Sequence, residues 1–158
     1  PALGLPLALA LLPVPVAADG TDVPRELFPL MVDLPGFSGP PADGSRVVMS
    51  GQLALSVTRR YRAVGGDARV TARVQASSAM AGQWQGRVEA SARQVRLAGL
   101  PAVVEGAGAA TDTRVTVRLG TSPVALFVLE TSGLGRTATL ELARRFPLAA
   151  MQAELGGR

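Results

Sequence analysis

Five arginines between positions 59 and 73 are the residues of this chain whose type and spacing best suit a chemical role. The segment LSVTRRYRAVGGDARVTARVQA carries Arg59, Arg60, Arg62, Arg69 and Arg73 around a Gly-Gly pair. A planar guanidinium donates paired hydrogen bonds to carboxylates and phosphates, so such a cluster is typical of an anion-binding surface. Arginines are also expected on the solvent side of an amphipathic strand. Both interpretations stay open at the level of sequence.

Residue types that the chain lacks exclude several kinds of catalysis. The 158 residues include no cysteine and no histidine, and every basic residue is an arginine. A Ser-His-Asp triad, a thiol nucleophile, a haem with a histidine or cysteine ligand and an ordinary zinc or copper site are therefore excluded. The methionines suit copper(I) but are dispersed, which indicates core positions for Met31, Met49, Met80 and Met151. We expect neither a metal nor a cofactor.

Acidic residues and a glycine-rich segment indicate no catalytic motif. The 12 carboxylates are scattered singly, so their spacing nominates no acid–base pair. The segment EGAGAA, with Gly106 and Gly108, lacks the third glycine of a dinucleotide-binding motif and the lysine of a P-loop. The leading hypothesis is a non-catalytic protein that binds a partner protein or an anionic or amphiphilic ligand. The alternative is a small cofactor-free enzyme whose carboxylates come together only on folding.

The first 18 residues differ in composition from the rest of the chain. PALGLPLALALLPVPVAA is apolar throughout, and its central run from Leu3 to Leu12 is short for a membrane span of about 20 residues. Such a run is typical of a secretory signal peptide, and Val16-Ala17-Ala18 offers the small residues of a cleavage site. A buried helix is the alternative, which the prolines at 6, 13 and 15 disfavour. We expect residues 1–18 to be a signal-peptide remnant that is cleaved after Ala18.

Export would limit the kinds of partner that this protein meets. The predicted product is periplasmic or secreted and has no transmembrane span. Its net charge of +4 is modest, and nucleic-acid-binding domains usually concentrate more basic charge and use lysine as well. An envelope protein, lipid head groups or an acidic polysaccharide are the expected partners, and nucleic acid is not. Without cysteine, the domain at residues 19–158 must be stabilised by packing rather than by disulfides.

A β-hairpin is expected to carry the arginines. Apolar and polar residues alternate with a period of two before and after VGGDA, which predicts two strands joined by a turn, with Gly65 and Gly66 at positive φ. Arg60 and Arg62 then face the same way as Arg69 and Arg73, opposite residues near 71 to 73. The available carboxylates for them are at Asp67 and Glu89, unless an anionic partner binds there.

Before this hairpin we expect a short helix and a loop. DVPRELFPLMVDL places Asp22 as the helix N-cap and four apolar residues on one helical face, namely Leu27, Leu30, Met31 and Leu34. PGFSGPPADGS has the composition of a loop with Phe37 exposed in it, and a flap that covers a ligand is the alternative.

The second half is predicted to continue the sheet. Residues 77–95 form a loop and a short helix with the only tryptophan, Trp84. Strands follow near 92–97, 102–105, 114–119 and 124–129, and the last is apolar on both faces, which indicates a central position. Arg114 and Arg118 are expected to point away from the core. A C-terminal helix should bury Leu140, Ala143 and Phe146 and break at Pro147.

These elements predict one α+β domain. We expect a mostly antiparallel sheet of five or six strands, a short N-terminal helix and a C-terminal helix packed on one face. The predicted core comprises Leu53, Leu55, Val57, Val70, Val74, Val115, Val117, Leu126, Val128 and Leu140.

Residues 24–154 resemble exported bacterial proteins with a PsbP/Mog1-like layout. The segments LFPLMVDLPGF and AGLPAVVE and the closing helix carry this resemblance. The resemblance implies no catalytic residue. The candidate binding site combines Arg60, Arg62, Arg69 and Arg73 with Phe37 and Trp84 around an apolar opening.

Overall fold

The computed structural model describes residues 20–91, 93–106 and 112–156. The expected signal peptide, its cleavage site after Ala18, and Gly108 lie outside these residues. Within them, nine strands form one antiparallel sheet in the order β1-β3-β4-β5-β9-β8-β7-β6, and β2 pairs with β4. The α+β class and the antiparallel sheet are confirmed. The predicted number of strands, five or six, is too low because the three strands before β4 are short or rich in glycine and polar residues.

The elements have the following bounds. Strands before the first α-helix are β1 (Gly20–Asp22), β2 (Phe37–Ser38), β3 (Asp43–Met49), β4 (Gln52–Ala63) and β5 (Arg69–Ala76). The later strands are β6 (Gln94–Leu97), β7 (Leu100–Glu105), β8 (Asp112–Thr121) and β9 (Val124–Ser132). A 3-10 helix, η1, spans Arg25–Leu30, and the α-helices are α1 (Met80–Ala90), α2 (Arg136–Ala143) and α3 (Leu148–Gly156).

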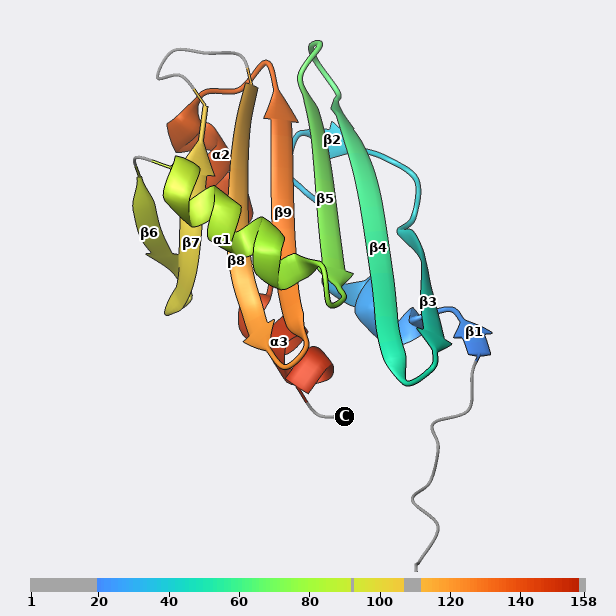
Figure 1. Cartoon of the computed structure of the whole chain (residues 1–158). Helices are drawn as coiled ribbons and strands as arrows, with labels where there is room; N and C mark the ends of the chain where they lie inside the picture. The colour runs from blue at the N-terminus through green and yellow to red at the C-terminus, as the bar shows by residue number, and fades with distance from the viewer. Residues whose placement is uncertain (1–19, 92, 107–111, 157–158) are drawn as a thin grey trace, which may run out of the picture.

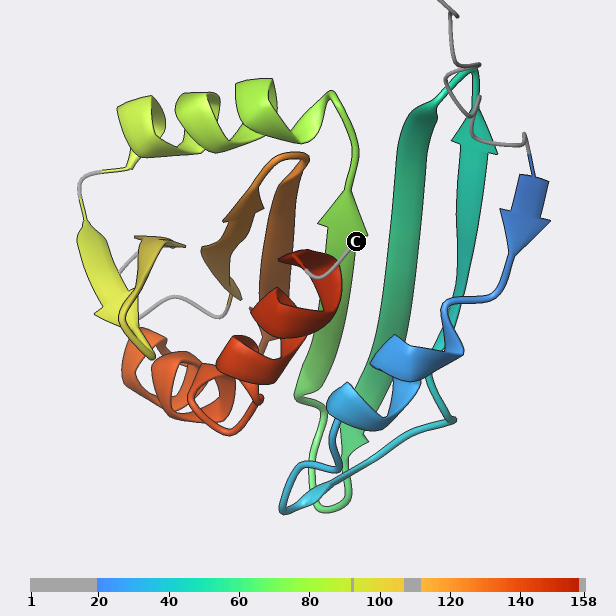
Figure 2. The ribbon, with the colours of Figure 1, turned by 90° about the horizontal axis from the view of Figure 1, so that it is seen from below.

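The helices cover both faces of the sheet (Figure 1, Figure 2). The elements η1, α2 and α3 lie on one side, and α1 lies on the other. The main core fills the side of η1, α2 and α3, where the Phe127 ring lies 4.9 Å from the Phe146 ring and Tyr61 meets Phe146 edge-on at 6.5 Å. A smaller cluster lies beneath α1, where Met80 contacts Leu126 and Val128. The sequence predicted helices on one face only.

The C-terminal helix is interrupted where expected. Pro147 separates α2 from α3, because proline lacks the amide that would continue the helical hydrogen bonding. Leu140, Ala143 and Phe146 are all buried, as predicted. The central position of β9 between β5 and β8 is also confirmed.

The predicted core is confirmed except at Leu53, which is half-buried at the edge of the main core. The core position expected for Met49 is wrong, because its side chain is 66% exposed, whereas Met31, Met80 and Met151 are buried. Leu126 and Val128 are buried because α1 covers the second face of β9. Arg114 and Arg118 lie on the face of β8 away from the main core, so the predicted alternation is correct there.

Two tight turns set the register of the hairpins. Ser50 and Gly51 both have positive φ, at 50° and 74°, and so do Ala98 and Gly99, at 50° and 77°. Two consecutive residues of this kind form the turn that matches the twist of a two-residue hairpin. The prediction of positive φ at Gly65 and Gly66 is wrong, because the β4–β5 connection has five residues, 64–68, and does not require it.

The N-terminal segment differs from its prediction in detail. Asp22 is not a helix cap: it lies in β1, and its carboxylate accepts hydrogen bonds from Arg46. The helix η1 is a 3-10 helix that follows Pro24 without a side-chain cap. Phe37 is half-buried in β2 and paired with Ala63 of β4, rather than exposed in a loop. Residues 43–45 of the predicted loop belong to β3.

Candidate functional site

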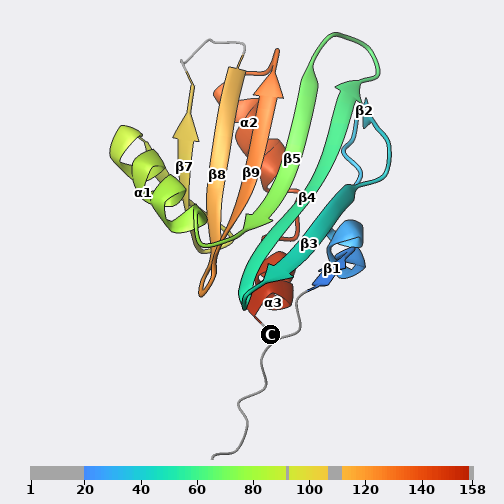
Figure 3. The ribbon, with the colours of Figure 1, turned by 45° about the vertical axis from the view of Figure 1, so that its right-hand side comes forward.

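One half of the sheet is left open on the side of α1. Helix α1 crosses β7, β8 and β9, and no described helix lies over β3, β4 and β5 on that side (Figure 1, Figure 3). The open half carries polar residues because every second residue of β4 and β5 packs into the main core on the opposite side.

Four predicted site residues lie together on this open half. Arg60 and Arg62 of β4 and Arg69 and Arg73 of β5 share one face, here named the arginine face. Arg60 lies opposite Thr71, as expected, but Arg62 lies directly opposite Arg69 rather than near residues 71 to 73. The connection between β4 and β5, residues 64–68, sets this register. The Ala63 amide donates a hydrogen bond to the Ala68 carbonyl oxygen. The next pair along the strands, Arg62 and Arg69, is therefore a non-hydrogen-bonded pair, the type in which opposite side chains lie closest.

The arginine face has little compensating negative charge. Arg60 Nη1 lies 4.0 Å from Asp43 Oδ2, and both side chains are exposed. Within the described parts of the chain, the side chains of Arg62, Arg69 and Arg73 form no ion pair or hydrogen bond. Neither expected carboxylate reaches them: Asp67 forms no ion pair with a described residue, and Glu89 accepts a hydrogen bond from Gln85.

The neighbouring Arg59 has a structural role. It points to the opposite side of β4, where its guanidinium donates to the carbonyl oxygens of Met31 and Pro40 and to the Asp33 carboxylate. It also lies over the ring of Tyr61, at 5.0 Å from the ring centroid. Arg59 therefore holds the segment after η1 against the sheet and does not belong to the arginine face.

A polar groove of about 570 Å³ begins at Arg69 and continues across β9 and β8 to the end of β7. It is lined by Arg69, Thr71, Glu105, Gly106, Asp112, Thr113, Arg114, Glu130, Thr131 and Ser132. The strand register aligns Thr71, Glu130, Arg114 and Glu105 in one row across four strands. Hydroxyl, guanidinium and carboxylate groups therefore alternate along this surface.

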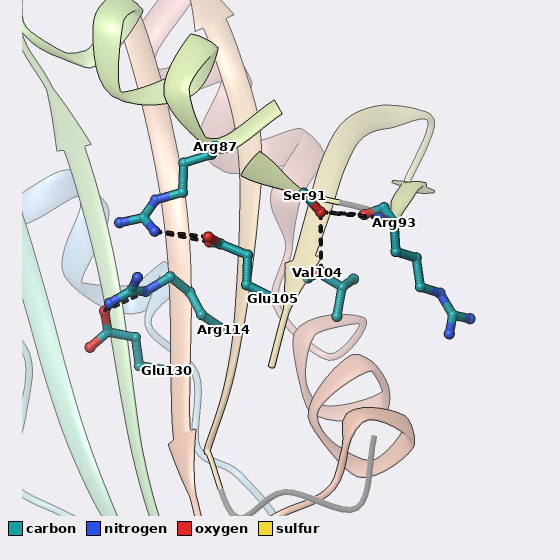
Figure 4. A network of polar contacts seen from close by, with 7 residues as sticks. All are labelled: Arg87, Ser91, Arg93, Val104, Glu105, Arg114 and Glu130. Carbon is teal, nitrogen blue, oxygen red and sulfur yellow. Dashed lines mark hydrogen bonds and ion pairs between the residues drawn. The ribbon is translucent and has the colours of Figure 1, made fainter. Parts of the chain in front are cut away.

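Two ion pairs fix Glu105 and Glu130, two of the three carboxylates that line the polar groove (Figure 4). Arg114 Nε donates to Glu130 Oε1 at 2.9 Å, and Arg87 Nη1 of α1 donates to Glu105 Oε2 at 3.0 Å. Arg114 thus lies between Glu105 and Glu130 on the sheet. Among the described residues, no group of three or more His, Cys, Asp or Glu side chains is suited to hold a metal ion.

Sequence reasoning missed this groove. It is built from segments far apart in the chain, and the registers between β5, β9, β8 and β7 were needed to find it. The outward positions of Arg114 and Glu130 on the two strands of the second hairpin were the only available signal.

The aromatic residues of the predicted site lie elsewhere. Phe37 packs against the main core, on the side of the sheet opposite α1. Trp84 of α1 packs against the small cluster and lies under Arg118, whose guanidinium carbon is 5.5 Å from the ring centroid. The structure therefore brings the four arginines together but does not bring Phe37 and Trp84 to them around one opening.

Comparison with known proteins identifies no relative. No protein-family model, curated protein or solved structure matches this chain. Across the described ranges, no helix combines the length and the apolar character that crossing a membrane requires.

Proposed function

We propose that this protein is a non-catalytic binding protein whose arginine face holds an acidic polysaccharide. The observation that carries the proposal is the direct opposition of Arg62 and Arg69, with no carboxylate paired to either among the described residues. Like charges directly opposite on paired strands destabilise a sheet. A bound carboxylate between the two guanidinium groups offsets this repulsion and accepts hydrogen bonds from both.

The neighbouring polar groove favours a sugar over a lipid head group. Thr71 and Ser132 offer hydroxyls, and Glu105, Asp112 and Glu130 offer carboxylate oxygens that accept hydrogen bonds from sugar hydroxyls. Glu105 and Glu130 are ion-paired to Arg87 and Arg114, and a phosphate group in the same groove would still meet the charge of Asp112. A chain of sugars that carries both hydroxyls and carboxylates matches the groove and the arginine face together.

The proposed location is periplasmic or secreted. The apolar segment at residues 1–18, with small residues before Asp19, supports export. An acidic polysaccharide of the cell envelope is available to a protein in that location.

One observation favours the alternative of a small cofactor-free enzyme: Glu105, Asp112 and Glu130 line one groove. Against it, Glu105 and Glu130 are each hydrogen-bonded to an arginine, and Arg114 lies between them. Incubation with an acidic oligosaccharide, followed by analysis of chain length, separates the two functions. A binding protein leaves the oligosaccharide intact, whereas an enzyme shortens it and loses this activity in the Glu130→Gln variant.

The proposal is tested by titrating the protein with polygalacturonate in buffers of increasing salt. Exposed charge contacts are screened over about 10 Å at 0.1 M salt, so the affinity should fall steeply as salt is added. Fully methyl-esterified polygalacturonate, which keeps the hydroxyls and lacks the charges, is the matched control and should not bind.

Three outcomes contradict the proposal. The first is an absence of binding at low salt, and the second is equal binding of the esterified polymer. The third is tighter binding to vesicles of anionic phospholipid than to polygalacturonate, which would assign the arginine face to lipid head groups.

A further inference from the structure

One row of directly paired residues crosses the sheet through the centre of the arginine face. The row comprises, in order across the strands, Ser38 of β2, Arg62 of β4, Arg69 of β5, Ser132 of β9 and Asp112 of β8. Residues that lie directly opposite each other share one face of a sheet, and all five are exposed. We call these five residues the cross-strand row.

The charge along the cross-strand row changes sign. It is neutral at Ser38, positive at Arg62 and Arg69, neutral at Ser132 and negative at Asp112. Across residues 20–91, 93–106 and 112–156, no ion pair compensates the Asp112 carboxylate. An anionic group is therefore attracted at the centre of the row and repelled at its β8 end.

The spacing of the strands suits a sugar chain that crosses them. Neighbouring strands lie about 4.8 Å apart, which is close to the length that one sugar residue adds to an extended chain. Such a chain places about one sugar over each strand that it crosses. The polar groove runs in this direction, from Arg69 over β9 and β8, so it contacts a chain from the sides as well as from below.

We propose, on the basis of the proposed function, that the polysaccharide crosses the strands along this row and is sparsely charged, with single acidic sugars followed by uncharged ones. One carboxylate lies between Arg62 and Arg69 and accepts hydrogen bonds from both. The sugars over Ser132 and Asp112 are uncharged, and their hydroxyls donate to the Asp112 carboxylate. A polymer with a carboxylate on every sugar brings one of them beside Asp112, where like charges repel.

A path along β4 and β5 is the alternative. There the chain leaves the polar groove and meets Arg60 and Arg73, so a polymer with a carboxylate on every sugar fits this path best. However, Asp43 lies 4.0 Å from Arg60 and opposite Thr58, the residue paired with Arg73, so this path also carries negative charge. The path across the strands is favoured because a groove contacts more of each sugar than an open strand surface does.

The test titrates the protein with polygalacturonate in which none, about half or all of the carboxyls are randomly methyl-esterified, at equal chain length and fixed salt. Binding that depends on charge alone weakens steadily as esterification removes charge. We expect instead the tightest binding at the intermediate degree. Steady weakening would overturn this inference and leave the proposed function standing. Absence of binding, or equal binding of all three polymers, would overturn the proposed function and this inference with it.

Two variants test the role of Asp112. Asp112→Asn removes the repelling charge at an exposed side chain and should raise the affinity for the unesterified polymer at least about twofold, without raising that for the half-esterified polymer. Glu141→Gln removes the same charge from an exposed position of α2, on the opposite side of the sheet, and should change neither affinity. Thermal unfolding verifies that both variants fold. Equal effects of the two substitutions would place the chain away from Asp112 and overturn the inference.

Discussion

Arg62 of β4 lies directly opposite Arg69 of β5, at a pair position where side chains approach closely. Their repulsion opposes folding, so Arg69→Glu should replace a like-charge pair by an ion pair. We expect this variant to raise the free energy of unfolding by about 0.2–1 kcal/mol and to lose affinity for polygalacturonate. Chemical denaturation measures the first effect and titration the second.

Arg69→Gln is the control for this prediction, because it removes the repulsion without adding an attraction. Its stability should lie between those of the wild type and Arg69→Glu. A fall in stability in both variants would mean that Arg69 has a stabilising partner and would contradict the account of the arginine face.

Tyr61 gives the fold a defined dependence on alkaline pH. Burial raises the pKa of Tyr61 to about 12, and its hydroxyl donates to the Val32 carbonyl at 2.7 Å. Because the pKa in the folded state lies above the unfolded value of about 10, the contribution of Tyr61 to stability is complete below pH 10. It should be lost as the pH rises from about 10 to about 12.

The chain has a single tyrosine, so tyrosinate absorbance reports on this residue alone. The Tyr61 hydroxyl should lose its proton above pH 10, together with the unfolding of the domain. Tyr61→Phe keeps the edge-on contact with Phe146 and should cost about 0.5–1.5 kcal/mol at neutral pH through the lost hydrogen bond. An ordinary titration near pH 10 without loss of structure would contradict this prediction.

Two glycine substitutions should change stability in opposite directions. A Cβ at Gly44 of β3 would lie 2.4 Å from the Ser56 carbonyl oxygen and 2.9 Å from the Val57 Cα, so β3 would have to shift away from β4. We expect Gly44→Ala to destabilise the fold by more than about 1 kcal/mol. Gly82 of α1 has nothing within 4 Å of an added Cβ, so Gly82→Ala should stabilise by about 0.5–1 kcal/mol. Thermal unfolding measures both, and a neutral Gly44→Ala would contradict the close packing of β3 on β4.

Trp84→Ala should lower stability without lowering the affinity for polygalacturonate. The substitution removes packing on Met80 and the contact with Arg118, of which the latter contributes about 0.5–1 kcal/mol at a partly exposed site. Denaturation and titration measure the two effects separately. Loss of affinity for polygalacturonate in a folded Trp84→Ala variant would show that Trp84 belongs to the binding site and would contradict this prediction.

Local periodicity predicted the parts of this molecule that depend on neighbouring residues. The alternation around Val57 and Val74 placed the four arginines on one face, and Pro147 marked the break between α2 and α3. The strands β2 and β3 were missed because segment 37–45 is rich in glycine and proline, which local patterns assign to a loop. The side covered by α1 was missed because the pattern of 77–95 does not show which face of the sheet the helix covers.

The polar groove depends on long-range register, which local patterns do not show. Glu105 and Glu130 meet at Arg114 only because β7, β8 and β9 pair in one particular register. The sequence pattern indicated the outward positions of Arg114 and Glu130 but not that Glu105 lies in the same row.

The central claim is most directly tested by comparing two double variants that remove the same charge from different places. Arg62→Gln/Arg69→Gln removes the two opposite charges of the arginine face. Arg144→Gln/Arg145→Gln removes two exposed arginines at the end of α2, on the opposite side of the sheet. Affinity for polygalacturonate at low salt should fall at least about tenfold in the first variant, the equivalent of about 1.4 kcal/mol, and stay near the wild-type value in the second. Equal affinities in the two variants would show that binding follows net charge alone and would contradict a site on the arginine face.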